Sequence, residues 1–119
     1  MAQPTRFAQL TADAKSRVRE VSPAEASRQQ AQGAVLIDVR EREEFEQGHA
    51  PNAIHLSKGL LELRIEEAVP DPATPIICYC GGGSRSALAA DNLQKMGYTN
   101  VASMAGGLKT WRNEGLPIS

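Results

Sequence analysis

The residues with the most evident chemistry form a cysteine-containing loop, CGGGSRS, at residues 80–86. An apolar run ends at Cys80, three glycines follow, and a helical pattern then begins. Glycines have no β-carbon, so they can turn successive backbone N–H groups toward one point and let a ligand approach closely. The N-terminal amides of the following helix add positive potential. Such a loop would hold an anion, which is the Cys80 thiolate, a persulfide or the oxyanion of a substrate.

Cys80 is therefore the candidate nucleophile, because a thiolate beside a helix N-terminus has a lowered pKa. Arg85 adds a fixed positive charge at the far end of the loop. The hydroxyls of Ser84 and Ser86 can help to bind an oxyanion, or Ser84 can cap the helix. The candidate anion-binding residues are Gly81, Gly82, Gly83, Ser84, Arg85 and Ser86.

Two plainer interpretations of the loop also stand. Glycine-rich turns between a strand and a helix bind nucleotide phosphates, but this one lacks the Walker lysine, and its glycines are contiguous rather than spaced as G-x-G-x-x-G. A cysteine at the end of a strand is also often only a small hydrophobic side chain.

The loop lies within a regular alternation of predicted strands and helices. Continuous apolar runs at 34–39 and 76–80 are typical of buried parallel strands. The segment 22–33 predicts a helix with Ser22 as its N-cap. Further strands are predicted at 18–21, 52–56 and 100–104, and further helices at 41–48, 60–69, 86–97 and 107–115. The alternation predicts an α/β domain with a mostly parallel sheet, in which ligands bind beyond the carboxyl ends of the strands.

Other polar residues near the strand ends allow a functional and a structural interpretation. Asp38 and Arg40 end the strand at 34–39, so they border the candidate site or pair with neighbours to fix the turn, for example Arg40 with Glu44. The structural interpretation is favoured. His49 is likewise predicted to hydrogen-bond a turn. Cys78 is either a resolving thiol or, as favoured here, a buried side chain of the core strand.

The helix predicted at 60–69 is expected to bury part of its apolar side chains. These are Leu60, Leu61, Leu63 and Ile65. For the N-terminal residues 1–16 the sequence predicts either a helical extension or a tail, which precedes a single domain at 17–119.

Composition excludes several classes of protein. The 119 residues carry a net charge of −1, without the basic excess of a nucleic-acid-binding protein. No apolar run approaches a membrane span, and no secretory signal is evident. The two cysteines are too few for a structural zinc site, so no metal and no organic cofactor are expected. Two thiols without an export signal predict a cytoplasmic protein.

Around the loop and beyond it, the sequence resembles the rhodanese family of sulfurtransferases. CGGGSRS is similar to the family's active-site loop, in which a cysteine opens a six-residue loop before a helix. LIDVREREEFEQGHAPNAIHL resembles the first signature of the family and GYTNVASMAGGLKTW its closing signature. The matching residues outside the loop are Asp38, Arg40, Glu44, Phe45, Gly48, His49, Gly106, Gly107 and Trp111.

The resemblance implies a three-layer rhodanese-like fold, with a central sheet of about five strands flanked by helices. It also implies transfer of sulfane sulfur through a Cys80 persulfide. The donor would be a small sulfur-containing anion such as thiosulfate or another persulfide, and the acceptor cyanide, a thiol or a protein. Two alternatives are a sulfur relay that delivers to a protein, and a binding or regulatory module without turnover, against which the presence of Cys80 argues.

The length and composition of the loop refine this expectation. Related phosphatases carry one residue more between cysteine and arginine, whereas here four residues separate Cys80 from Arg85, which favours a sulfur-sized guest. Many family members that use thiosulfate also carry a cation inside the loop, where this chain has only glycines. Arg85 is left, with Arg64 as a possible helper, so we hypothesise that thiosulfate is a poor donor. The sequence does not predict the oligomeric state.

Overall fold

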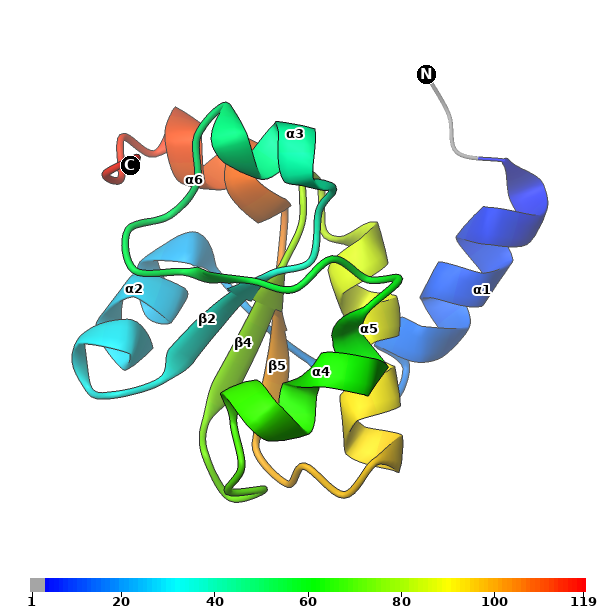
Figure 1. Cartoon of the computed structure of the whole chain (residues 1–119). Helices are drawn as coiled ribbons and strands as arrows, with labels where there is room; N and C mark the ends of the chain where they lie inside the picture. Colours follow the sequence, from blue (N-terminus) through cyan, green and yellow to red (C-terminus); the bar gives the residue numbers. More distant parts are fainter. Residues whose placement is uncertain (1–3) are drawn as a thin grey trace.

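The five strands form one parallel sheet in the order β1-β5-β4-β2-β3 (Figure 1). A computed structural model of the chain describes residues 4–119. The strands are β1 (Arg19–Val21), β2 (Val35–Asp38), β3 (Ile54–His55), β4 (Ile76–Tyr79) and β5 (Val101–Met104). Every residue of β4 and β5 is buried, because helices cover both faces of the sheet. This explains why the apolar run at 76–80 is continuous rather than alternating.

Within residues 4–119, six helices connect and flank the strands. They are α1 (Thr5–Lys15), α2 (Pro23–Ala31), α3 (Arg42–Glu46), α4 (Leu61–Ala68), α5 (Ser84–Lys95) and α6 (Gly107–Asn113). The Ser22 side chain accepts a hydrogen bond from the Glu25 N–H at 3.1 Å, as the sequence predicts for the start of α2. The order of elements confirms the predicted α/β class. None of the helices within residues 4–119 is long and apolar enough to span a membrane.

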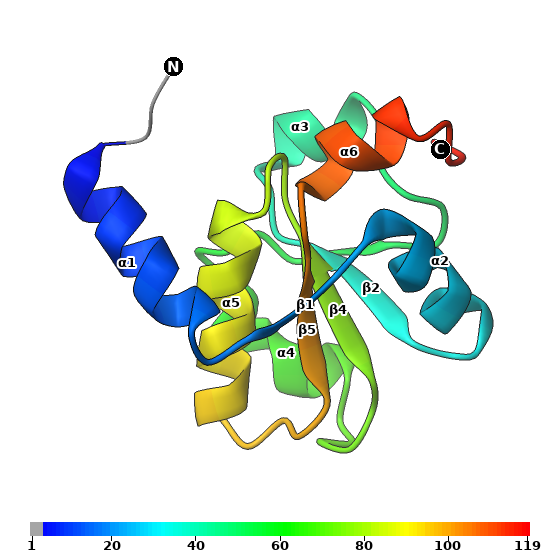
Figure 2. The ribbon, with the colours of Figure 1, turned by 180° about the vertical axis from the view of Figure 1, so that it is seen from behind.

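Two hydrophobic clusters hold the layers together, one on each face of the sheet. On one face, Leu61 and Ile65 of α4 and Leu93 of α5 pack against Ile37 and Cys78. On the other face, side chains of α2 and α6 cover the sheet, including Ala26, Leu108 and Trp111. The two views in Figures 1 and 2 show these helices on opposite sides of the strands.

The predicted burial of helix α4 is half right. Leu61 and Ile65 are fully buried, whereas Leu60 is 43 % exposed and Leu63 is 80 % exposed. The two buried residues are four apart and lie on the same face of the helix, and the others point away from it. The apolar residues therefore predict that a helix forms here, but they do not predict which of its faces is buried.

The N-terminal segment is helical over α1, which lies along α5 (Figure 2). Thr11 and Ala14 are its buried residues, and Arg17 just beyond it pairs with Asp91 of α5 at 2.8 Å. Of the predicted helix or tail, residues 1–3 lie outside the described part of the chain. The division into an extension and a domain stays a prediction.

Helix α6 begins directly against the loop that follows β4. The Leu108 N–H donates to the Cys80 carbonyl at 2.8 Å, and the Lys109 N–H donates to the Gly81 carbonyl at 3.1 Å. Gly107 has φ +60°, and a β-carbon there would lie 2.6 Å from the Cys80 oxygen. Only glycine fits this position. The close contact and the two hydrogen bonds from α6 together hold the loop in place at the end of β4.

We predict that Gly107→Ala destabilises the protein much more than Gly115→Ala. Gly115 has φ +74°, but a β-carbon there would meet no atom within 4 Å, so its substitution costs only the left-handed backbone penalty of about 1–2 kcal/mol. Gly107→Ala adds a steric clash with the loop and should cost about 3–5 kcal/mol. Urea titration gives both free energies of unfolding, and equal losses would contradict the tight contact.

Candidate active site

The Cys80 sulfur lies among hydrogen-bonding groups of the loop that follows it. It accepts the Gly83 N–H at 3.0 Å and the Ser86 N–H at 3.4 Å, and the Ser86 hydroxyl oxygen lies 3.5 Å away. The residue is only 1 % exposed. Burial raises the pKa of the thiol, but the Ser86 hydroxyl and the N–H groups of Ser86, Gly83 and Gly82 outweigh it, so the pKa is lowered overall. The site thus stabilises a thiolate.

The backbone of Gly83 makes this arrangement possible. Its φ of +102° is in the left-handed region, and a β-carbon would lie 3.2 Å from the Gly106 nitrogen. This conformation turns the Gly83 N–H back toward the sulfur and makes Gly83 the N-cap of α5. The helix therefore begins at Ser84, and the predicted capping role of the Ser84 side chain is wrong. The predicted loop residues 81–86 do surround Cys80.

Arg85 is held by a carboxylate from another element. Its two terminal nitrogens donate to the two oxygens of Glu44 at 2.8 and 3.0 Å. Glu44 lies on α3 and also accepts the Glu41 N–H at 3.1 Å. The Arg85 hydrogen bonds, with help from the Glu41 N–H and against the effect of burial, lower the pKa of Glu44 to about 2. The pair ties the loop end to α3.

The sequence does not predict this partner of Arg85, since it offers Glu44 only as an example of a neighbour for Arg40. In the structure Arg40 pairs with Asp38 instead, with Nη2 to Oδ2 at 2.8 Å. Both side chains are buried, and Arg40 also donates to the Gly48 carbonyl at 2.7 Å. Asp38 and Arg40 therefore fix the turn after β2, as the favoured interpretation has it, rather than contact Cys80.

Cys78 and His49 have the structural environments predicted for them. Cys78 is fully buried, and burial raises the pKa of its thiol to about 12, which makes it a poor resolving thiol. The Nδ1 atom of His49 lies 3.0 Å from the Phe45 carbonyl, and the two rings stack with centroids 3.8 Å apart. Both residues support the site without entering it.

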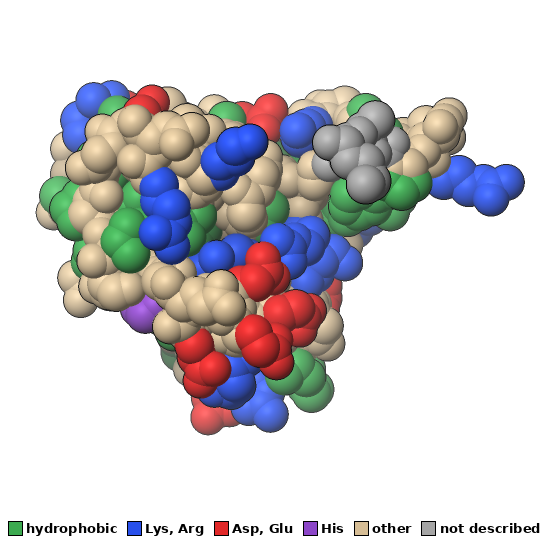
Figure 3. Space-filling view, turned by 90° about the horizontal axis from the view of Figure 1, so that it is seen from above, with side chains coloured by type: hydrophobic (Ala, Val, Ile, Leu, Met, Phe, Trp, Pro, Cys, Tyr) green, Lys and Arg blue, Asp and Glu red, His purple; other side chains and the backbone are tan. Residues whose placement is uncertain are grey.

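Arg64 lies apart from the loop. It lines a groove of about 370 Å³ with Arg42, His55 and Leu60, at the carboxyl ends of β2 and β3. Figure 3 looks down on the edge that carries α3 and α6, where basic and acidic side chains are interspersed. Arg64 is therefore on the same edge as Cys80 but makes no hydrogen bond or ion pair to the loop among the described residues.

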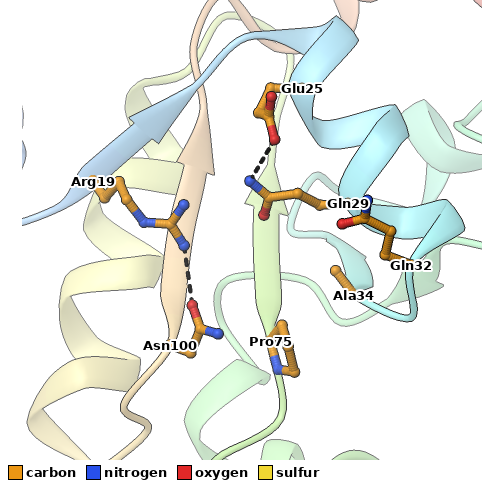
Figure 4. Close-up of a pocket in the computed structure, with 7 residues that line it drawn as sticks. All are labelled: Arg19, Glu25, Gln29, Gln32, Ala34, Pro75 and Asn100. Atoms are coloured by element: carbon orange, nitrogen blue, oxygen red, sulfur yellow. Dashed lines mark hydrogen bonds between the residues drawn. The ribbon is translucent and has the colours of Figure 1, made fainter.

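A second hollow lies at the opposite edge of the sheet (Figure 4). Its volume is about 380 Å³, and residues before β2, β4 and β5 line it together with α2. Arg19 there donates to Asn100 at 3.1 Å, and Gln29 donates to Glu25 at 3.0 Å. These side chains satisfy one another, so the hollow is a polar surface feature rather than a second reactive site. Within residues 4–119 no three His, Cys, Asp or Glu side chains gather to hold a metal ion.

Comparisons with known proteins match this architecture. The family model of the rhodanese-like domain matches residues 22–114. The thiosulfate sulfurtransferase GlpE of Pseudomonas syringae is 37 % identical over 79 % of this chain and 87 % of its own length. GlpE of Haemophilus influenzae is 38 % identical over 84 % of this chain and 93 % of its own length.

Two solved structures resemble the whole chain. The polysulfide-sulfur transferase homodimer of Wolinella succinogenes is 31 % identical, with TM-score 0.82 over 97 % of this chain and 88 % of its own. A protein of unknown function from Rhodopseudomonas palustris, described as a possible tyrosine phosphatase, is 34 % identical. Its TM-score is 0.85 over 100 % of this chain and 99 % of its own.

We predict that Glu44→Gln lowers the free energy of unfolding by about 1 kcal/mol at neutral pH, since the ion pair is partly exposed and screened. Glu44 has a depressed pKa in the folded state, so its contribution exists above its ordinary pKa near 4.5 and is lost as the pH falls toward 2. The difference between wild type and variant should therefore vanish in acid. Glu43→Gln, on the same helix, is the matched control. A difference that stays constant down to pH 2 would contradict the assignment.

Proposed function

Because the chain belongs to the family of rhodanese-like domains, we propose that it is a sulfurtransferase in which Cys80 carries sulfane sulfur from a donor to a thiophilic acceptor. The observation that carries this proposal is the buried Cys80 sulfur, which accepts the N–H groups of Gly83 and Ser86 and has the Ser86 hydroxyl oxygen 3.5 Å away. Such an environment stabilises a sulfur anion without any neighbouring base.

The first half-reaction forms the persulfide. The Cys80 thiolate attacks the outer sulfur of the donor, a new S–S bond forms, and the donor's own S–S bond breaks. The leaving group takes that electron pair and departs as sulfite if the donor is thiosulfate, or as a shorter sulfide chain if it is a polysulfide. The loop amides then face the persulfide sulfurs in place of the thiolate.

The second half-reaction removes the transferred sulfur from Cys80. A nucleophilic acceptor attacks the terminal sulfur of the persulfide, the S–S bond breaks, and its electrons return to the Cys80 sulfur as thiolate. Cyanide would leave as thiocyanate and a thiol as a persulfide. No net oxidation or reduction of the protein occurs over the cycle, and Cys78 takes no part in it.

The length of the loop argues against phosphatase chemistry. Four residues separate Cys80 from Arg85, one fewer than in the related phosphatases, so the loop has less room for a tetrahedral oxyanion. Glu44 engages two of the five N–H groups of Arg85, at 2.8 and 3.0 Å, and orients its side chain at the end of this short loop. The spacing favours a sulfur guest in the loop.

The donor is constrained by the open side of the loop. Gly82 is exposed, has no left-handed φ, and a β-carbon there would meet no atom within 4 Å. Glycine at this position is therefore not required by the backbone, and its effect is an uncharged, uncrowded entrance. This supports a polysulfide or a larger persulfide as the preferred donor over thiosulfate. Two free thiols suit a reducing compartment, so we place the reaction in the cytoplasm.

Sulfur transfer from polysulfide to cyanide tests the proposed function. Cys80→Ser should abolish thiocyanate formation, because serine has no sulfur that could carry the transferred atom. Cys78→Ala, two residues away on the buried strand, should keep most of the rate. Turnover that survives in folded Cys80→Ser protein would overturn the proposal.

We predict that Gly82→Lys lowers the KM for thiosulfate about two- to fivefold, because an added surface cation attracts the sulfonate of the donor. Gly82→Ala is the control for size without charge and should leave the KM unchanged. Steady-state kinetics at low salt give both values. Equal KM values for the lysine and alanine variants would show that the missing loop cation does not set the donor preference.

A further inference from the structure

A second buried hydroxyl stands behind the one that faces Cys80. The Ser86 and Ser103 hydroxyl oxygens lie 2.8 Å apart, and both residues are fully buried. Ser103 is in β5, where its backbone is paired in register with Cys78 of β4. The three atoms therefore form a chain, from the Cys80 sulfur to the Ser86 oxygen at 3.5 Å and on to the Ser103 oxygen.

The direction of hydrogen bonding along this chain depends on the charge of Cys80. A thiolate can only accept, so the Ser86 O–H must then point at the sulfur, and the Ser86 oxygen is free to accept the Ser103 O–H. A protonated thiol can donate to the Ser86 oxygen, and the Ser86 O–H then points at Ser103 instead. Both hydroxyls are buried away from solvent, so each must be satisfied within the chain and its backbone surroundings.

We propose that Ser103 is a positioning residue of the sulfur-transfer site, which holds the Ser86 hydroxyl in the direction of the Cys80 sulfur. Its hydroxyl donates to the Ser86 oxygen and polarises the Ser86 O–H, so that the donor facing the sulfur is both oriented and strengthened. When the Cys80 sulfur takes up or releases a proton, the two hydroxyls rotate together. Apart from that S–H bond, only hydrogen bonds change in this step.

Other charged and titratable groups near the Cys80 loop come from five elements. Arg85 of α5 interacts with the Cys80 sulfur and is paired with Glu44 of α3, and Cys78 of β4 is the other thiol. The Asp38–Arg40 pair closes the end of β2 and Lys109 lies in the first turn of α6. None of these contacts Ser103 by a hydrogen bond or ion pair among the described residues, so a change at Ser103 leaves them in place.

The test is the pH dependence of Cys80 alkylation by iodoacetamide, measured in a Cys78→Ala background so that a single thiol reacts. Ser103→Ala should raise the midpoint by about half a pKa unit, which makes the reaction about threefold slower below the midpoint and unchanged on the alkaline plateau. The Cys78→Ala protein with Ser103 intact is the reference for this comparison. Because both proteins carry the same small deletion in the buried strand, a difference in midpoint comes from Ser103.

A pair of variants of equal shape separates the hydroxyl from packing. Ser103→Thr keeps the hydroxyl and Ser103→Val replaces it with a methyl group, so the midpoint should stay near wild type in the first and rise in the second. This comparison also decides the question if Ser103→Ala fails to fold. Equal midpoints for the threonine and valine variants would overturn the proposal.

The role of Ser103 in sulfur transfer rests on the proposed function. Its effect on the Cys80 thiolate does not, since alkylation requires no sulfur donor. A shifted midpoint in a protein that transfers no sulfur would retain Ser103 as a positioning residue for the thiolate while refuting the sulfurtransferase. An unshifted midpoint in a protein that does transfer sulfur would refute only the role of Ser103. In active protein, we further expect kcat/KM below the midpoint to fall with the thiolate fraction.

Discussion

A sulfur anion inside a protein needs hydrogen-bond donors that replace water, and this requirement organises the whole carboxyl edge of the sheet. The Cys80 sulfur is nearly inaccessible to solvent, yet its pKa is lowered by the Ser86 hydroxyl and by the backbone N–H groups of Ser86, Gly83 and Gly82. Burial alone would have the opposite effect. Cys78, two residues earlier in β4, shows this: no donor to its sulfur is found among residues 4–119, and burial raises its pKa to about 12.

Three supports keep the donors in place. The left-handed backbone of Gly83 turns the chain so that its N–H points inward. Helix α6 holds the loop from behind through its contacts to the Cys80 and Gly81 carbonyls. The Glu44–Arg85 pair ties the loop to α3. The loop is therefore held from three sides where it meets the sulfur, and Gly82 is its exposed residue.

The parts of this site that depend on local sequence could be predicted. Contiguous apolar runs identify the buried strands, Ser22 caps α2 as expected, and the strand–cysteine–glycine order places Cys80 at the carboxyl edge. The parts that depend on distant pairing could not. Glu44 and Arg85 are 41 residues apart, and several glutamates of the acidic stretch at 41–46 were equally plausible partners. Ser103 lies within a buried strand, where sequence gives no sign that its hydroxyl meets Ser86.

The account rests on Cys80 as the residue that carries the transferred sulfur. The most direct measurement is the mass of the intact protein after reaction with polysulfide and removal of excess donor, followed by fragment masses that locate the added atom. We predict a gain of ~32 Da, one sulfur atom, on the fragment that contains Cys80, and its loss after addition of cyanide. A folded protein that gains no sulfur, or that carries it on Cys78, would contradict the account.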